Sequence, residues 1–313
     1  GVDEAGGELP PREVLEALRR RTEPLVRLTS PVFLSDAGDG AGVRRGLGGV
    51  PTAGSEGRPV LFVGNHELLG VEVGYLVREF ALDKGESLRG LAHPYVLRLA
   101  QLLTGARDED GRETDLFRQF GAVEVSGAAL YRLMELRQNA LLFPGGASEV
   151  YHKKGEEYQV FWPANVTDFV RIAARFDAIV VPFGAVGWED NFEVLLDRDE
   201  LLDLPVVGDQ LRRLVESIPS ARPGQSETFL PPLLRPRAPA RFYALFGPPL
   251  DTRTLNPRDR EGCREAYEGL RASVQHNVRW LLRRREEDPY KDLKPRVLEE
   301  LRTGQQAPTF PLP

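Results

Sequence analysis

Apolar runs alternate with amphipathic segments along much of the chain. Four consecutive apolar residues at 60–63 predict a strand that is buried on both faces. From 68 to 80 the apolar residues recur with helical spacing, which predicts a helix directly after that strand. Similar runs predict strands at 121–125, 139–143, 178–183 and 241–246, and amphipathic spacing predicts helices at 11–28, 165–176 and 263–281.

This alternation predicts an α/β fold with a mostly parallel central sheet that is flanked by helices on both faces. We assign residues 59–285 to the main domain, after an N-terminal helix and Gly-rich linker at 1–58 and before a C-terminal tail at 286–313. Leucines and prolines break the rhythm at 198–239. A segment of this length predicts an irregular insertion that serves as a lid or a lipid-contacting arm.

Composition narrows the class of protein. The chain has 313 residues, 41% of them apolar, which is enough for a sizeable core, and its net charge of -6 argues against nucleic-acid binding. The one cysteine, Cys263, excludes an internal disulfide and falls on the apolar face of a helix, so we expect it in the core.

No apolar run reaches the ~18 residues that span a bilayer, so any membrane contact is expected to be peripheral. Because the sequence opens without methionine, we expect a processed protein or part of a longer one.

A histidine follows the first buried strand. Gly64-Asn65 allows a sharp turn after 60–63, and His66 is then predicted to lie at the carboxyl end of an interior strand, where open α/β sheets bind ligands. A histidine there can act as a general base near neutral pH. A carboxylate that binds its other ring nitrogen would fix the tautomer, and Glu72 and Glu67 are the nearby candidates.

Two more strand ends carry residues suited to ligand contact: Pro144–Glu149 and Pro182–Gly184. The amides of Gly145 and Gly146 can stabilise an oxyanion or hold a phosphate, and Lys153 and Lys154 can add charge for a phosphate-bearing donor. Each of these features alone is also typical of an ordinary structural role. A lone histidine can be structural, a Pro-Gly-Gly sequence can be a plain turn, and lysines beside glutamates are often surface ion pairs.

In combination, the motifs resemble the glycerolipid acyltransferase superfamily. The resemblance lies in Gly64-Asn65-His66 followed by an acidic residue, then Phe143-Pro144-Gly145-Gly146, then Val180–Gly184. Residues 145–149 and the run 152–158 are similar to the diacylglycerol acyltransferase-like domain of the phytyl ester synthases. Phe161-Trp162-Pro163 and 241–247 also resemble that group.

This resemblance implies acyl transfer to phytol or diacylglycerol from acyl-CoA, acyl carrier protein or a galactolipid, with neither a cofactor nor a metal. It implies a plastid location, at the plastoglobule or thylakoid surface. His66 would deprotonate the acceptor for direct attack, and Glu72, or else Glu67, would orient it. The substrate and donor contacts that we expect are Asn65, Gly145, Gly146, Glu149, Lys153 and Lys154. Since members often carry a hydrolase-like domain upstream, the chain is expected to be a fragment or a short relative.

The chain departs from the wider superfamily at two positions. The superfamily has H-x-x-x-x-D, whereas here the acid, Glu72, comes one place later. Gly145 replaces the glutamate of a Pro-Glu-Gly-Thr motif, which favours neutral acceptors over glycerol phosphates. A lipid hydrolase at the same site, a lysophospholipid acyltransferase and a non-catalytic lipid-binding protein remain as alternatives.

Overall fold

The computed structural model describes residues 7–53, 57–98, 116–164, 166–216 and 229–312. The strands of its main sheet are β1 (Val32–Asp36), β2 (Val43–Arg45), β3 (Val60–Gly64), β4 (Arg89–Ala92), β5 (Val123–Glu124), β6 (Asn139–Leu142), β7 (Ile179–Val186), β10 (Tyr243–Phe246) and β11 (Leu250–Asp251). The helices are α1 (Arg12–Thr29), α2 (Glu72–Glu79), α4 (Leu116–Gln119), α5 (Gly127–Glu135), α6 (Ala147–Val150), α7 (Asp168–Arg175), α8 (Arg198–Leu202), α9 (Val207–Glu216), α10 (Arg260–Arg284) and α11 (Leu293–Thr303).

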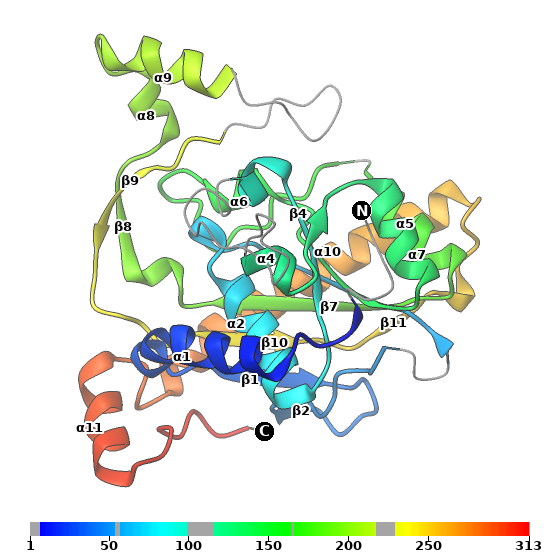
Figure 1. Ribbon diagram of the computed structural model, residues 1–313, viewed down its shortest axis with the longest axis horizontal. Helices are drawn as coiled ribbons and strands as arrows, with labels where there is room; N and C mark the ends of the chain where they lie inside the picture. The colour runs from blue at the N-terminus through cyan, green and yellow to red at the C-terminus, as the bar shows by residue number, and fades with distance from the viewer. Residues whose placement is uncertain (1–6, 54–56, 99–115, 165, 217–228, 313) are drawn as a thin grey trace.

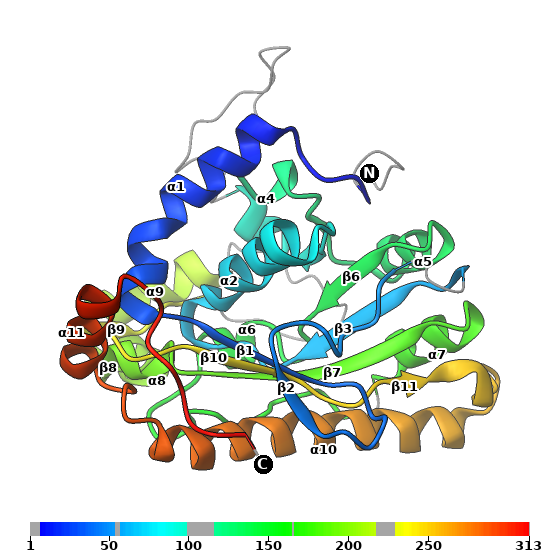
Figure 2. The same cartoon turned by 90° about the horizontal axis from the view of Figure 1, so that it is seen from below.

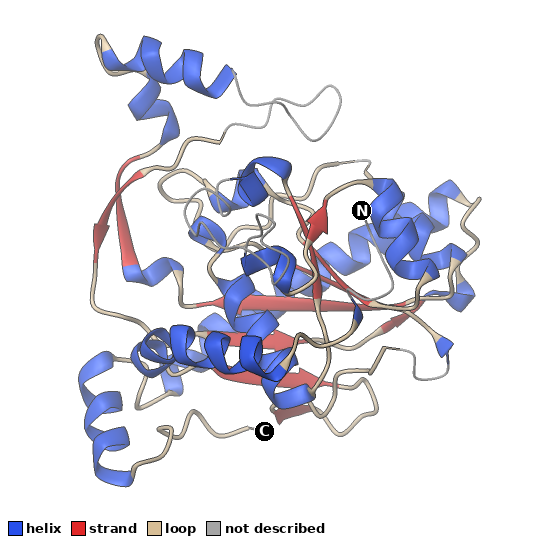
Figure 3. Cartoon of the chain, in the orientation of Figure 1, coloured by secondary structure: helices blue, strands red, loops and turns tan. Residues whose placement is uncertain are grey.

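The nine strands form one sheet in the order β2-β1-β10-β7-β3-β6-β4-β5, with β11 paired to β7 (Figures 1 and 3). Strand β3 lies between β6 and β7 and is parallel to both, and β4 is parallel to β5 and β6. Within this sheet, the antiparallel pairs among the described residues are β1 with β2 and β7 with β10 and β11. The prediction of a mostly parallel sheet is therefore confirmed.

Helices cover both faces of the sheet, and β3 supplies core residues to each side (Figure 2). Leu61 and Val63 pack in one cluster with residues of α5, α7 and α10, whereas Val60 and Phe62 pack in another with residues of α2. All four are wholly buried, and each such side chain contributes roughly 1.5–3 kcal/mol by leaving water. Burial on both faces explains why this strand reads as an unbroken apolar run.

The N-terminal segment belongs to the sheet, which the sequence analysis did not predict. Residues 1–58 were expected to form a helix and a linker, but β1 pairs in parallel with β10 and β2 adds an edge strand. The chain order hides this contact, because the partner of Val32 is Tyr243, far along the sequence. The sheet therefore extends beyond the predicted domain of 59–285.

The predicted insertion contains regular structure where it is described. Strands β8 (Phe192–Leu196) and β9 (Leu233–Pro236) form an antiparallel pair that carries α8 and α9 away from the main sheet (Figure 1). Asp197 and Glu200 form a capping box that fixes the start of α8. We call the described residues of 192–236 the arm. The part of the insertion at 217–228 lies outside the described residues.

The segment predicted as a C-terminal tail folds back on the body. It contains α11, and Phe310 beyond that helix is wholly buried. A buried ion pair of 3.1 Å joins Arg241 Nη1 to Asp288 Oδ2, and the Arg241 guanidinium also donates to the carbonyl oxygens of Ala307 and Pro308. These bonds fasten the end of the chain beside β10. None of the described helices combines the length and the apolar character that crossing a bilayer requires.

Candidate active site

His66 lies at the carboxyl end of β3, as predicted, and the end of β6 lies beside it. The register places Val63 opposite Leu142 and Gly64 opposite Phe183. A side chain at position 64 would clash, because its Cβ would come within 2.2 Å of the Phe183 ring. The predicted third strand end, 182–184, instead lies inside β7, which continues to Val186 because β10 pairs with it there.

The imidazole of His66 is bonded through Nδ1 to Oε1 of Glu72, in the first turn of α2. The Glu72 side chain is wholly buried, whereas that of His66 is 16% exposed. One ring face of His66 stacks on Phe143, with centroids 4.0 Å apart and planes 14° apart. A carboxylate that accepts the Nδ1–H proton leaves Nε2 as the unprotonated, basic nitrogen.

A turn between His66 and Glu72 accommodates the extra residue relative to the H-x-x-x-x-D pattern. Leu69 and Gly70 both have left-handed backbones, with φ of 63° and 69°. A Cβ at position 70 would lie 2.8 Å from Cε1 of His66, so only glycine leaves the ring in place there. Sequence spacing alone gives no sign of this turn, which brings Glu72 back to the histidine.

Glu67, the alternative partner, points elsewhere. Its Oε1 accepts the backbone N–H of Trp188 at 3.0 Å, and its side chain is wholly buried. Burial raises its pKa well above the usual range for a carboxyl, and the charges of Glu189 and Glu72 add to this. The structure therefore pairs His66 with Glu72.

Asn65 and the two glycines make backbone contacts. The Asn65 amide donates to the Ala185 carbonyl at 3.0 Å and accepts the Ala185 N–H at 2.8 Å, which ties the end of β3 to β7. The N–H of Gly146 donates to the Phe143 carbonyl at 3.1 Å in a turn before α6. That amide is thus already used, although we expected it to face an oxyanion.

Glu149 is buried beneath this turn and binds two backbone amides. Its Oε2 accepts the N–H of His66 at 2.7 Å, and its Oε1 accepts that of Phe161 at 2.8 Å. The side chains of Lys153 and Lys154 extend toward the arm, where each forms an ion pair of 2.5 Å, with Asp199 and Glu200 of α8 respectively. These two lysines therefore join the loop after α6 to the arm.

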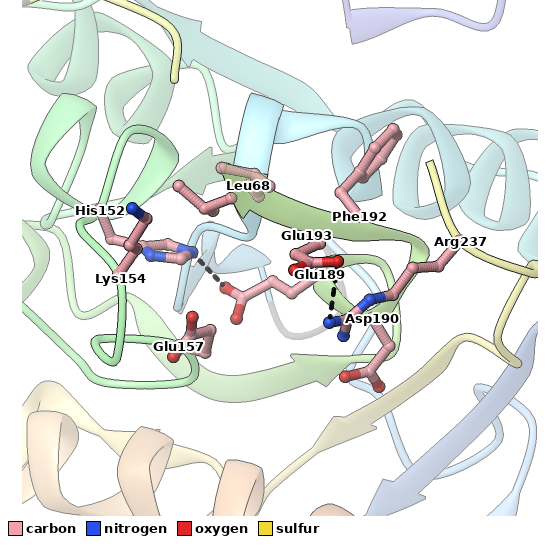
Figure 4. Close-up of a pocket in the computed structure, with 10 residues that line it drawn as sticks. Leu68, His152, Lys154, Glu157, Glu189, Asp190, Phe192, Glu193 and Arg237 are labelled. Atoms are coloured by element: carbon pink, nitrogen blue, oxygen red, sulfur yellow. Dashed lines mark ion pairs between the residues drawn. The ribbon is translucent and has the colours of Figure 1, made fainter. Parts of the chain in front are cut away.

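A second buried pair was missed by the sequence analysis. His152 and Glu189 are both buried, and Nε2 of His152 lies 3.5 Å from Oε1 of Glu189 (Figure 4). The pair lies at a cavity of about 300 Å³ that Leu68, Phe192 and Arg237 also line. The motif at 152–158 pointed to this region, but the distant Glu189 gave no signal because only the fold brings it near.

The stability of the protein should fall as pH rises from about 6 to 9. Burial raises the pKa of Glu149 to about 8. Burial opposes charging of His152, but the adjacent Glu189 outweighs burial and raises the His152 pKa to about 9. Both groups then hold more protons when folded than when unfolded in this window, so deprotonation favours unfolding. Thermal melts at pH 6 and 9 should differ by several degrees.

The variant His152→Gln should flatten the part of this slope that lies between about pH 6.5 and 9. Its matched control is His276→Gln, on an exposed position of α10, which should keep the wild-type slope. A melting temperature that stays level or rises toward pH 9 in the wild type would contradict the assignment.

Comparison with known proteins agrees with the motifs. No protein-family model matches the chain. It is 37% identical to phytyl ester synthase 2, chloroplastic, of Arabidopsis thaliana in a match that covers 91% of this chain and 40% of that protein. It is 36% identical to phytyl ester synthase 1, chloroplastic, of the same plant in a match that covers 96% of this chain and 43% of that protein. The chain thus spans about two fifths of the length of these relatives.

Among solved structures, a match is found to the 1-acyl-sn-glycerophosphate (LPA) acyltransferase of Thermotoga maritima. The TM-score is 0.46 at 12% identity, and the match covers 85% of this chain and 79% of that one.

The fold and site define an α/β protein with a histidine–glutamate pair at the carboxyl edge of a mostly parallel sheet. By sequence the chain is a homologue of the phytyl ester synthases. The resemblance to the phytyl ester synthases that the motifs predict is confirmed over about two fifths of their length.

Proposed function

We propose that the chain catalyses transfer of a fatty acyl group to the hydroxyl of a neutral lipid alcohol, phytol or diacylglycerol. The observation that carries this proposal is the bond between Nδ1 of His66 and the buried Glu72 at the end of β3. It leaves Nε2 able to take a proton from an alcohol. The names of the two Arabidopsis relatives, phytyl ester synthases, support the same chemistry.

In the proposed reaction, Nε2 of His66 removes the hydroxyl proton as the alcohol oxygen attacks the acyl carbonyl. The tetrahedral intermediate collapses, the bond to the donor breaks, and the proton passes from His66 to the leaving group. The leaving group is the thiol of acyl-CoA or acyl carrier protein, or a hydroxyl of a galactolipid. Glu72 stabilises the imidazolium that forms between the two proton transfers.

Local charge supports a neutral acceptor. The carboxyl group of Glu72 adjoins His66 and disfavours a phosphate at the same place. Lys153 and Lys154 are engaged by carboxylates of α8. An acceptor such as lysophosphatidate would therefore meet a negative environment beside the reacting histidine.

An acyl-transfer assay tests the proposal. Labelled acyl-CoA, acyl carrier protein and galactolipid donors are each offered phytol, diacylglycerol and lysophosphatidate. We expect labelled ester with phytol or diacylglycerol. Ester formed only from lysophosphatidate would identify a lysophospholipid acyltransferase, and free fatty acid as the main product with every acceptor would identify a hydrolase. Either result would contradict the proposed function.

We also propose that the arm contacts the lipid surface. The arm exposes Val206 (80%) and Val207 (47%), together with Leu195, Leu214 and Leu233. Val206 also has a left-handed backbone with φ of 69°, which is costly for a β-branched residue. The described arm carries four arginines and seven aspartates and glutamates. An apolar surface on an acidic arm suits neutral lipid, such as a galactolipid membrane or a plastid lipid droplet, better than an anionic bilayer.

The double variant Val206→Asp/Val207→Asp should lose most of its binding to galactolipid vesicles and to triacylglycerol emulsions, measured by flotation. Two charges at exposed apolar positions oppose burial in lipid. The matched control is Leu298→Asp/Leu301→Asp on α11, where the same kind of side chains are 59% and 78% exposed. We expect the control to float like the wild type. Equal loss in both variants, or no loss in the first, would remove the arm from the lipid contact.

A further inference from the structure

The carboxyl group of Glu149 connects two parts of the site. The side chain is 2% exposed and projects from the four-residue helix α6. One oxygen accepts the backbone N–H of His66 and the other that of Phe161, at 2.7 and 2.8 Å. The end of β3, the turn after β6 and the segment leading to the buried Trp162 are thereby held by one side chain.

The position of Gly145 depends on the same carboxyl group. A Cβ built on Gly145 would lie 2.1 Å from Cδ of Glu149 and 2.3 Å from its Oε1. Real Cβ contacts are essentially never this short, and moving the carboxyl group aside would disturb its two backbone hydrogen bonds. The space beside position 145 is therefore filled from position 149, one helical turn later in the chain.

We infer that Glu149 is a positioning residue, which sets the backbone of His66, and that Gly145 is glycine because the Glu149 carboxyl group fills its side-chain space. The inference rests on the proposed function, since it assumes that His66 is the base. With both oxygens on backbone amides, Glu149 acts on the reaction through His66 rather than through the substrate.

Loss of the hydrogen bond between Glu149 and the His66 amide should slow catalysis. The bond to the His66 amide fixes the backbone from which the ring reaches both Glu72 and the face of Phe143. If the bond is lost, a buried N–H remains unsatisfied and the strand end shifts to find a partner. A displacement of about 1 Å at a reacting group can cost roughly 10²-fold in rate.

The variant Glu149→Gln tests this role with little change of shape. Its amide has one acceptor oxygen, so it can accept only one of the two N–H groups, and its NH₂ faces the other. We expect kcat to fall by about 10- to 100-fold while KM for the acceptor changes by less than about 3-fold. Hydrogen exchange should become faster at the His66 amide or at the Phe161 amide, whichever loses its acceptor. The control Glu135→Gln, on an exposed position of α5, should leave all three unchanged.

A double-mutant cycle tests whether a side chain at position 145 and the carboxyl group of Glu149 compete for the same space. Gly145→Ala alone should lower kcat, because the new methyl group displaces the carboxyl group. In a Glu149→Ala background the same methyl group enters an empty space, so adding Gly145→Ala should cost little more. Gly145→Glu combined with Glu149→Gly should recover part of the kcat that Glu149→Gly loses, because a carboxyl group again occupies the site.

Several outcomes would overturn the inference. They are wild-type kcat in a folded Glu149→Gln variant, a rise in KM with kcat unchanged, which would mean direct substrate contact, and simple additivity of the two alanine substitutions. Rates are measured with whichever acceptor the wild type uses, so a wrong acceptor class leaves this test intact. Hydrogen exchange at the His66 and Phe161 amides reports these contacts without any activity, and unchanged exchange at both amides in Glu149→Gln would refute the inference by itself.

Discussion

Replacing His66 with alanine should lower kcat for ester formation by about 10³-fold, within the range that general bases contribute. The variant loses the only group in the proposed reaction that takes the hydroxyl proton. The acceptor must then attack as a neutral alcohol, with its proton passing to water. Initial rates at saturating acceptor, compared with wild type, measure the loss.

The effect should be specific to His66. Its side chain is partly exposed and its ring rests on Phe143, so removal leaves a recess open to water and the fold should persist. The matched control is His276→Ala, at an exposed position of α10, which should retain wild-type kcat. Binding of the acyl donor to His66→Ala, measured by calorimetry, should stay within about 3-fold because the base acts in the transition state. A variant that keeps more than a tenth of wild-type kcat would show that the base lies elsewhere.

Replacing Glu72 with glutamine should lower kcat by about 10²- to 10⁴-fold, as seen when the acid that orients a catalytic histidine becomes an amide. Glutamine keeps the size of the side chain but can turn its NH₂ toward Nδ1. The ring then carries its proton on Nε2, where the base is needed. The imidazolium also loses the adjacent negative charge that stabilises it. Steady-state rates of the purified variant test this.

The second acidic candidate provides the comparison. Glu67→Gln removes a carboxyl group that accepts from the Trp188 amide and does not contact the ring. We expect its kcat to stay within about 10-fold of wild type, because the glutamine oxygen can still accept that N–H. If Glu67→Gln lost as much activity as Glu72→Gln, the assignment of the partner acid would fail.

The sequence predicted the parts of the site that lie close together along the chain. The run at 60–63 placed His66 at a strand end, and Glu72 was proposed as its partner from spacing and resemblance. Both predictions agree with the structure, because a buried strand and the helix after it fix their own junction. The parallel sheet followed from the strand–helix rhythm for the same local reason.

The rest depends on contacts between distant segments. Asn65 and Glu149 were expected at the substrate, yet their side chains bind the backbone of Ala185 and of His66 with Phe161. Composition cannot distinguish a polar side chain that serves a ligand from one that satisfies a buried amide. The membership of β1 in the sheet likewise rests on its pairing with β10. Lys153 and Lys154 contact the arm because α8 packs against the loop that carries them, and their own sequence does not indicate this contact.

Direct transfer with His66 as the base requires that no residue carries the acyl group during the reaction. The intact mass of the protein, measured during the reaction, tests this most directly. The wild-type chain is mixed with labelled acyl donor alone, and samples are quenched at short intervals for measurement of the intact protein mass. Phytol or diacylglycerol is then added to the remaining reaction. We predict no acyl mass on the protein at any time, and ester only after the alcohol is present. An acyl adduct on any residue that forms before the alcohol is added and then passes into ester would contradict direct transfer.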